Sequence, residues 1–248
     1  MTKAEIQFVR SLSDKRVRDA ERLFIAEGDK LIGEIVQSGW RVRNLYALEG
    51  HFDGHAERVS ETEMERISQL KTASSSLAVV EQPRHKTVAS APATALSLAL
   101  DGVQNPGNLG TIIRLADWFG VEDIYCSEDT ADCFNPKVVQ ATMGAILRVR
   151  VHYLPLAEFL RRSTESGVAV YGTMLDGEDI YGAELRQSGL IVMGNEGRGV
   201  SAACAESFTH RLLIPAYPPE RQGSESLNVA MATGIVCAEF RRRVRGVK

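Results

Sequence analysis

Short apolar runs alternate with helical patterns along the C-terminal part of the chain. Each run has the length of a buried strand, and between the runs apolar residues recur every three or four positions, as on one face of a helix. This alternation predicts βαβ units and therefore a mostly parallel sheet. The predicted strands span residues 96–100, 124–126, 149–151, 168–171, 190–193 and 212–214. Because ligands bind beyond the carboxyl ends of parallel strands, we expect function in the loops that follow these runs.

The N-terminal part of the chain has a less regular pattern. Apolar residues recur with helical spacing from Leu31 to Val36 and stop at Gly39, and short strand-like runs follow at 42–48 and 77–80. This mixture predicts a small α/β domain.

A segment rich in proline and small residues separates the two patterns. It spans residues 81–95 and contains Pro83 and Pro92, each of which lacks a backbone N–H and restricts the residue before it. Such a segment is typical of a connector. We therefore expect a mixed α/β domain over residues 1–88 and a parallel-sheet domain over residues 95–248.

Composition and charge narrow the functional classes. The chain has 248 residues, of which 44% are hydrophobic and 25% charged, as in ordinary globular proteins. Its net charge of −3 excludes a uniformly basic nucleic-acid binder but not a local basic patch. One candidate patch ends the last helix at 241–245, and another contains Arg10, Lys15, Arg16 and Arg18. Acidic residues interrupt this second patch, so it is either a solvated helix face with internal ion pairs or a surface that contacts phosphates.

Nothing in the sequence indicates a membrane or a metal. No apolar run approaches the ~18 residues that span a bilayer, and the N-terminus lacks the apolar stretch of a secretory signal. None of the four cysteines belongs to a C-x-x-C pair. We therefore expect no metal site and a cytoplasmic protein with reduced cysteines.

The loop after the first predicted strand carries an unusual set of small and polar residues. It reads NPGNLG from Asn105 onward and leads into a helix whose apolar stripe runs to Phe119. Asn108 is the predicted N-cap of this helix, and Arg114 lies off the stripe, on a side that can face the loop. The glycines fit neither the dinucleotide fingerprint nor the Walker A pattern, which disfavours a dinucleotide-dependent oxidoreductase.

Two further loops carry residues that simple turns do not need. The loop after the strand at 190–193 reads GNEGRG over residues 194–199. Its three glycines allow the backbone to approach a ligand closely, and Glu196 places an acid between them. The segment before the last helix reads SESLNV over residues 224–229, where Ser226 is the predicted N-cap and Asn228 falls in the first turn.

In order and spacing, the three loops together resemble the motifs of the SpoU family of RNA ribose 2′-O-methyltransferases, also called TrmH-like, within the SPOUT class. The first motif matches residues 105–114, the second residues 191–199, and the third Ile214-Pro215 followed by residues 226–230. The resemblance covers about residues 96–243. The N-terminal domain resembles the substrate-binding domain of rRNA-directed members.

The resemblance implies a fold and a cofactor that the pattern alone does not. It implies a parallel sheet whose C-terminal segment is threaded into a deep trefoil knot, a feature so rare that patterns do not predict it. It also implies a homodimer formed through the knotted domain, and S-adenosylmethionine bound in the knot largely by backbone groups. The positions that match the cofactor site are Met193, Gly194, Asn195, Gly197, Ile214 and Leu227.

The resemblance assigns the central catalytic role to Arg114. A guanidinium group is a poor base because it keeps its proton at neutral pH. Arg114 therefore either acts with help, for instance from the substrate phosphate, or fixes that phosphate and stabilises the developing alkoxide. By the same resemblance, Asn105 orients Arg114 or the ribose, and Glu196 orders the loop or the cofactor. Ser226 and Asn228 hydrogen-bond the substrate or Arg114.

The resemblance leaves the RNA substrate open. The N-terminal domain favours rRNA, and 23S rRNA above all, but a tRNA ribose methyltransferase shares the same catalytic motifs. A non-catalytic RNA-binding relative that keeps the fold is a further alternative. It is disfavoured because each expected catalytic position holds the expected residue.

Overall fold

The computed structural model describes residues 1–86, 88–218 and 226–244, and the chain forms two compact units. The prediction of a mixed α/β part followed by a parallel-sheet part is confirmed. The boundaries differ from the predicted 1–88 and 95–248, because a later segment folds with the N-terminal part. Unit 1 consists of Met1–Arg84 and Asp132–Leu147, and unit 2 consists of His85–Ala131 and Arg148–Lys248.

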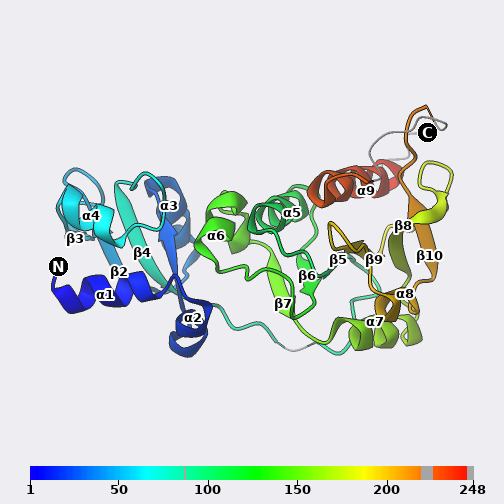
Figure 1. Ribbon diagram of the computed structural model, residues 1–248, viewed down its shortest axis with the longest axis horizontal. Helices are drawn as coiled ribbons and strands as arrows, with labels where there is room; N and C mark the ends of the chain where they lie inside the picture. Colours follow the sequence, from blue (N-terminus) through cyan, green and yellow to red (C-terminus); the bar gives the residue numbers. More distant parts are fainter. Residues whose placement is uncertain (87, 219–225, 245–248) are drawn as a thin grey trace. The chain divides into compact units, whose positions relative to one another are not determined.

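Unit 1 is built on a four-stranded sheet with the strand order β1-β4-β2-β3 (Figure 1). Strand β4 pairs antiparallel with β1 and β2, while β2 and β3 run parallel. The strands are β1 Leu23–Glu27, β2 Val42–Ala47, β3 Glu57–Arg58 and β4 Ser76–Glu81. The helices are α1 Lys3–Ser11, α2 Lys15–Glu21, α3 Asp29–Ser38, α4 Glu61–Ile67 and α6 Pro136–Thr142, followed by a 3₁₀ turn at Ala145–Leu147.

Both faces of this sheet are covered, which explains why all five residues of β1 are buried. On one face, Ile25 and Val79 pack in a core with residues of α1 and α4. On the other face, the ring of Phe24 lies 4.9 Å from that of Phe134 and 6.1 Å from that of Trp40, centroid to centroid. Phe134 belongs to Asp132–Leu147, so this later segment completes the core of unit 1.

Glu27 ends β1 as a buried carboxylate with an exposed fraction of only 4%. Its Oε2 accepts a hydrogen bond from Ser68 Oγ at 2.6 Å, and its Oε1 accepts one from the backbone N–H of Gln69 at 2.8 Å. Burial disfavours the charged form and raises the pKa of Glu27 above its usual value in spite of these bonds.

Unit 2 contains a six-stranded sheet in which every pairing is parallel, with the order β10-β8-β9-β5-β6-β7. All the predicted strands are present. They are β5 Leu96–Asp101, β6 Asp123–Cys126, β7 Arg150–Tyr153, β8 Val170–Asp179, β9 Gly189–Gly194 and β10 His210–Leu213. Because β5 and β9 are neighbours, the loops after them leave the same edge of the sheet side by side.

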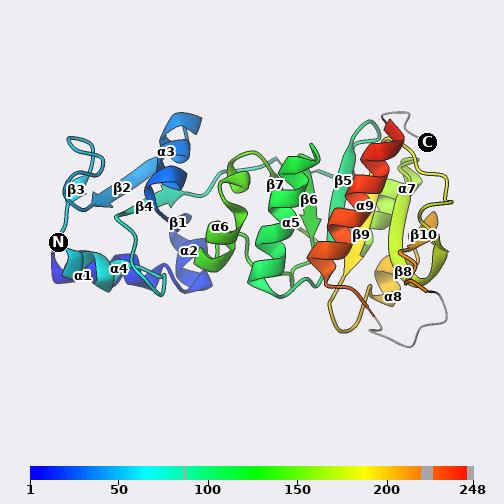
Figure 2. The same ribbon diagram turned by 90° about the horizontal axis from the view of Figure 1, so that it is seen from above.

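Helices cover both faces of the parallel sheet (Figures 1 and 2). Helices α5 Pro106–Trp118 and α9 Val229–Val244 lie side by side on one face. Helices α7 Leu156–Glu165 and α8 Ala202–Ala205 lie on the other. The apolar stripe predicted for α5 is buried at Leu109, Ile112 and Ala116. The sheet therefore fixes α5 with its polar side outward.

Strand β8 is much longer than the predicted run 168–171. Its second half pairs with β10 after a register shift and is largely exposed, with Leu175 71% exposed, so it has no apolar pattern to reveal it. Gly177 permits this pairing, because a Cβ there would lie 2.5 Å from the carbonyl carbon of Leu212.

The trefoil knot stays a prediction, because residues 219–225, between β10 and α9, lie outside the described residues. In residues 1–86, 88–218 and 226–244, no helix has the length and apolar character needed to cross a membrane.

Replacing the carboxylate of Glu27 with a neutral amide should change how the free energy of unfolding depends on pH. The raised pKa means that the folded protein binds this proton more tightly than the unfolded chain does, so ionisation of Glu27 costs stability. The cost is absent below the ordinary pKa of 4.5 and fully present above the folded pKa. Relative to the unchanged protein, Glu27→Gln should therefore gain stability as pH rises from about 4 to about 7 in urea denaturation.

The matched control is Glu65→Gln, at an exposed glutamate of α4. Its stability relative to the unchanged protein should show no such rise. A relative stability of Glu27→Gln that stays constant or falls with pH would contradict this account.

Candidate functional site

The loops after β5 and β9 are tied to each other at the carboxyl edge of the sheet. Asn195 Nδ2 donates to the carbonyl of Gly102 at 2.7 Å. The backbone N–H of Ser201 donates to Asp101 Oδ2, also at 2.7 Å. The parallel sheet thus brings together two of the loops that the sequence singled out.

Asn105, and not Asn108, is the N-cap of α5. Asn105 Oδ1 accepts hydrogen bonds from the backbone N–H groups of Gly107, at 2.8 Å, and Asn108, at 3.1 Å. The prediction of the cap was wrong by one turn because the helix begins at Pro106, and proline is well suited to the first helical position. This shift leaves the side chain of Asn108 free to bind outside its own helix.

Asn108 connects all three loops. Its Nδ2 donates to Glu196 Oε1 at 2.8 Å, and its Oδ1 accepts from Asn228 Nδ2 at 3.0 Å. A carboxylate only accepts hydrogen bonds, so the amide nitrogen of Asn108 must face Glu196 and its oxygen must face Asn228. From the sequence, Asn108 is predicted only as a cap. The signal for a wider role was a second asparagine in the same short motif.

Asn228 caps the last helix in place of Ser226. Its Oδ1 accepts from the backbone N–H groups of Ala230, at 3.0 Å, and Met231, at 3.3 Å. The predicted cap was therefore two residues early, and α9 begins at Val229. Ser226 is exposed, with no hydrogen bond to another described residue, and Ser224 and Glu225 lie outside the described part of the chain.

The loop after β9 is a tight turn that explains two of its glycines without a ligand. Asn195 and Gly199 exchange two backbone hydrogen bonds of 2.9 Å, and Gly199 has a φ of +69°. A Cβ at Gly194 would lie 2.3 Å from the carbonyl carbon of Gly199. Asn195 Oδ1 accepts from the N–H groups of Gly197 and Arg198, at 2.9 and 3.1 Å. Asn195 therefore shapes the loop, and Glu196 projects from it as an exposed acid.

Arg114 lies on the exposed side of α5 and forms no hydrogen bond or ion pair with the residues that the structure describes. Trp118, four residues later and so on the same face, is 83% exposed. The structure thus brings Asn105, Glu196 and Asn228 together around Asn108, and leaves the guanidinium of Arg114 available to a substrate.

The remaining cofactor candidates lie at the carboxyl ends of β9 and β10 and at the start of α9. Met193 is buried, with its sulfur 3.8 Å from Thr173 Oγ1. Ile214 directly follows β10, and Leu227, 51% exposed, precedes the cap of α9. The backbone groups of Ile214 and Leu227 have no hydrogen-bond partner among the described residues. This edge therefore offers apolar side chains beside unpaired backbone donors and acceptors.

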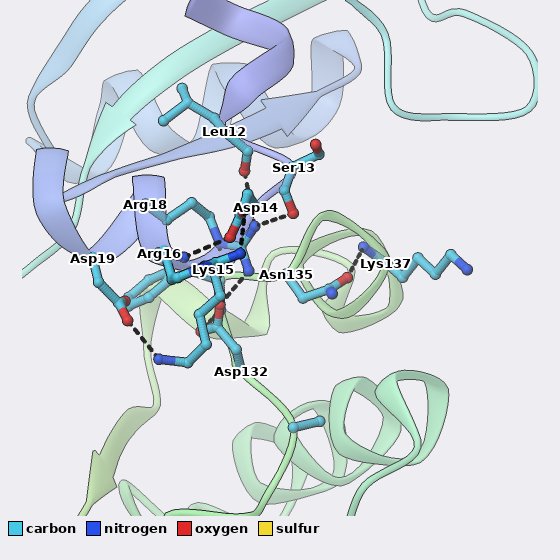
Figure 3. Close-up of polar contacts among 12 residues, drawn as sticks. Leu12, Ser13, Asp14, Lys15, Arg16, Arg18, Asp19, Asp132, Asn135 and Lys137 are labelled. Atoms are coloured by element: carbon cyan, nitrogen blue, oxygen red, sulfur yellow. Dashed lines mark hydrogen bonds and ion pairs between the residues drawn. The ribbon is translucent and has the colours of Figure 1, made fainter.

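The expected basic patch of unit 1 is not uniform (Figure 3). The prediction that Arg18 contacts RNA is wrong. Arg18 is 1% exposed and ion-paired with Asp132, so it is not part of an RNA-contacting surface. Lys15 and Arg16 are exposed, but each lies beside an aspartate of its own helix region. Arg10 is exposed and has no ion-pair partner among the described residues.

Most arginines of the second basic cluster, residues 241–245, make contacts within the protein. Arg241 donates to the carbonyls of Phe119 and Gly120 beyond the end of α5. Arg242 and Arg243 both pair with the buried Glu239. Arg245 lies outside the described residues. Within those residues, no group of three or more His, Cys, Asp or Glu side chains could hold a metal ion.

Comparison with protein families matches both parts of the chain. Residues 95–238 match the SpoU rRNA Methylase family, and residues 3–85 match the MRM3-like substrate binding domain. The chain is 32% identical over 242 residues to the 23S rRNA (guanosine(2553)-2′-O)-methyltransferase RlmP of Bacillus subtilis (strain 168), with 94% of each chain covered. It is 27% identical over 261 residues to the 23S rRNA (uridine(2479)-2′-O)-methyltransferase of Streptomyces viridochromogenes, covering 94% of this chain and 87% of that one.

Solved structures agree with these matches. A protein of Porphyromonas gingivalis assigned to the TrmH family of RNA methyltransferases superposes with a TM-score of 0.88 at 39% identity, over 98% of this chain and 99% of that one. An AdoMet-bound rRNA methyltransferase of Sinorhizobium meliloti superposes with a TM-score of 0.86 at 30% identity, over 98% and 96%. The resemblance seen in the three loops is thereby confirmed, and the chain belongs to the SpoU rRNA methylase family.

Proposed function

We propose that the protein transfers a methyl group from S-adenosylmethionine to a ribose 2′-hydroxyl of RNA, and that its substrate is 23S rRNA. The observation that carries the proposal is the chain of hydrogen bonds Asn228–Asn108–Glu196, which joins the three family motifs at the start of α5, the helix that also carries Arg114. Relatives that match almost the whole chain are named as 23S rRNA 2′-O-methyltransferases.

The edge formed by Met193, Gly194, Ile214 and Leu227 fits this cofactor. The adenine ring of the cofactor is flat, with apolar faces and hydrogen-bonding groups at its rim, and such ligands are held between apolar side chains by a few backbone groups. The backbone groups of Ile214 and Leu227, which have no partner among the described residues, offer those bonds. Asn195 and Gly197 shape the adjoining turn. When bound, S-adenosylmethionine supplies a methyl group on a positively charged sulfur, already activated for transfer.

The protein's own task is to position the ribose hydroxyl and to stabilise the charge that develops on it. The guanidinium of Arg114 can bind a phosphate of the substrate in a bidentate manner and donate a further N–H to the 2′-oxygen as its proton leaves. Because a guanidinium keeps its own proton, the hydroxyl proton passes to the substrate phosphate or to water. The contribution of Arg114 is therefore electrostatic.

The neighbouring polar groups hold this arrangement in place. Asn105 Oδ1 is occupied by the cap of α5, so Asn105 serves the substrate only as a donor, through Nδ2. Glu196 holds Asn108 and does not touch Arg114. Ser226, exposed just before the cap of α9, is free to hydrogen-bond the ribose.

Unit 1 is the part that distinguishes rRNA from tRNA as substrate. Its residues 3–85 match a substrate binding domain, and the 23S rRNA-directed relatives match along nearly the whole chain. We assign Arg10, Lys15 and Arg16 to its RNA-contacting surface, because all three are exposed. All four cysteines are buried, which suits the reducing cytoplasm, where we place the reaction.

A homodimer formed through α5 and α9 accounts for an otherwise unexplained apolar surface. Trp118 is 83% exposed, Met231 64% and Leu227 51%, and the helices that carry or follow them pack against each other. Large exposed apolar side chains on neighbouring helices are typical of an interface, and a two-fold dimer uses the same face twice. Since Arg114 shares a face with Trp118, a partner copy would adjoin the site.

Arg114→Ala should lower kcat for methyl transfer by roughly two to three orders of magnitude, because it removes the donor to the developing oxyanion. Affinity for S-adenosylmethionine, measured by isothermal titration, should stay nearly unchanged. The assay uses purified protein and 23S rRNA, with mass spectrometry of nucleosides to identify the 2′-O-methyl product.

The control is Arg161→Ala, at an exposed arginine of α7 paired with Glu165. Near-normal turnover of Arg114→Ala would remove Arg114 from the mechanism. A methylated base in place of a methylated ribose would refute the proposed reaction.

Met231→Glu and Trp118→Glu should each convert a dimer into a monomer, because a charge in the apolar interface leaves an unpaired ion on association. Sedimentation velocity at micromolar concentrations measures the change. Leu175→Glu, at an exposed leucine of β8, is the matched control and should stay dimeric. A native protein that is monomeric, or variants that remain dimers, would contradict the proposed interface.

A further inference from the structure

The segment Asp132–Leu147 leaves and rejoins unit 2 at points tied to the two ends of α5. Before the segment, the N–H of Ala131 donates to the carbonyl of Val103 at 2.9 Å, two residues before the cap Asn105. After the segment, Arg148 binds Asp117 in the last turn of α5, with Nε at 3.0 Å and Nη2 at 2.8 Å from Oδ2. The chain is thus anchored at both the beginning and the end of the helix that carries Arg114.

The residues before Ala131 strengthen the first of these anchors. Ser127 Oγ accepts from the N–H of Gly102 at 2.8 Å, and Thr130 Oγ1 donates to the carbonyl of Leu100 at 3.1 Å. Tyr153 Oη donates to the carbonyl of Ala131 at 2.5 Å. Both backbone groups of Ala131 are therefore held within unit 2.

The next residue, Asp132, is held within unit 1 by a buried ion pair (Figure 3). Arg18 donates to Asp132 Oδ2 from Nη2 at 2.5 Å and from Nε at 3.1 Å. Arg18 Nη1 donates to the carbonyls of Leu12 and Ser13 at 2.8 and 2.7 Å. The side chains of Arg18 and Asp132 are only 2% and 11% exposed. Such a pair holds one geometry, because moving either partner leaves a buried charge uncompensated.

The rest of the segment Asp132–Leu147 also packs within unit 1. The ring of Phe134 lies against that of Phe24, and Val138 and Val139 of α6 are buried. At Gly144 the chain passes so close to α3 that an added Cβ would lie 2.5 Å from Glu34 Oε2.

We propose that Asp132–Leu147 couples unit 1 to helix α5, so that Arg18 and Asp132 are positioning residues for Arg114. Ala131 and Asp132 are adjacent, one held by unit 2 and the other by unit 1, and no free residue separates the two anchors. Movement of unit 1 when RNA binds is therefore transmitted to the ends of α5. The inference rests on the proposed function, in which Arg114 serves methyl transfer.

The most specific test makes the junction between Ala131 and Asp132 flexible without removing a contact. Two glycines inserted between Ala131 and Asp132 leave the hydrogen bonds of both residues available, and a short insertion costs little loop entropy. With the full-length protein and 23S rRNA, we expect kcat to fall by about tenfold to a hundredfold and the KM for RNA to change less than about threefold. An insertion that merely weakened RNA binding would raise KM instead.

The control inserts the same two glycines between Ala89 and Ser90, in the connector, and should leave both constants unchanged. An unchanged kcat in the Ala131 insertion, or an equal loss in the control, overturns the proposal.

Asp132→Asn tests the same coupling through the ion pair and is read by hydrogen–deuterium exchange, which needs no activity. Both this variant and the Ala131 insertion should accelerate exchange of the amides of α5, at a temperature where thermal denaturation shows each protein to be folded. The Ala89 insertion should not. Equal exchange in α5 for all the proteins overturns the coupling. If the native protein transfers no methyl group, the proposed function fails, while the exchange comparison still decides on the coupling.

Discussion

The side-chain amide of Asn108 is the point at which three separate loops become one site. Parallel pairing of β5 with β9 brings two of the loops to the same edge, and packing of α9 against α5 brings the third. The amide then donates to Glu196 and accepts from Asn228, whose own oxygen caps α9. Because a carboxylate only accepts, each bond determines the direction of the next. The start of α5, the loop after β9 and the start of α9 are therefore oriented together.

Elements with a regular buried pattern could be predicted from the sequence, and elements defined by contacts distant in the chain could not. The apolar runs of the parallel sheet and the stripe of α5 are local signals, and the structure contains them all. The caps were misplaced because Asn105 and Asn108 are both good caps, and only the start of the helix decides between them. The sequence predicts Arg18 as a surface cation because its partner, Asp132, is distant in the sequence. Asp132 lies within the C-terminal part of the chain but folds with unit 1.

In a chain with a net charge of −3, the ion pairs determine which basic side chains remain available to an RNA substrate. Arg18 is buried against Asp132, and Arg242 and Arg243 surround Glu239, so these cations stabilise the fold and add little to the outer field. Arg114 contrasts with them, since it has no partner among the described residues and lies on an exposed helix face. Among the described residues, the cation that the proposed mechanism uses thus stays available, while other basic groups are used in the structure.

The most direct test of this account is a double-mutant cycle across the bond between Asn108 and Asn228. Asn108→Ala, Asn228→Ala and the double variant are compared by kcat/KM for methyl transfer to 23S rRNA. If the amide chain acts as a unit, the losses of transition-state stabilisation should not add. The loss in the double variant should then be smaller than the sum of the two single losses, by about 1 kcal/mol or more. Losses that simply add would show that the two asparagines act independently and would contradict the account.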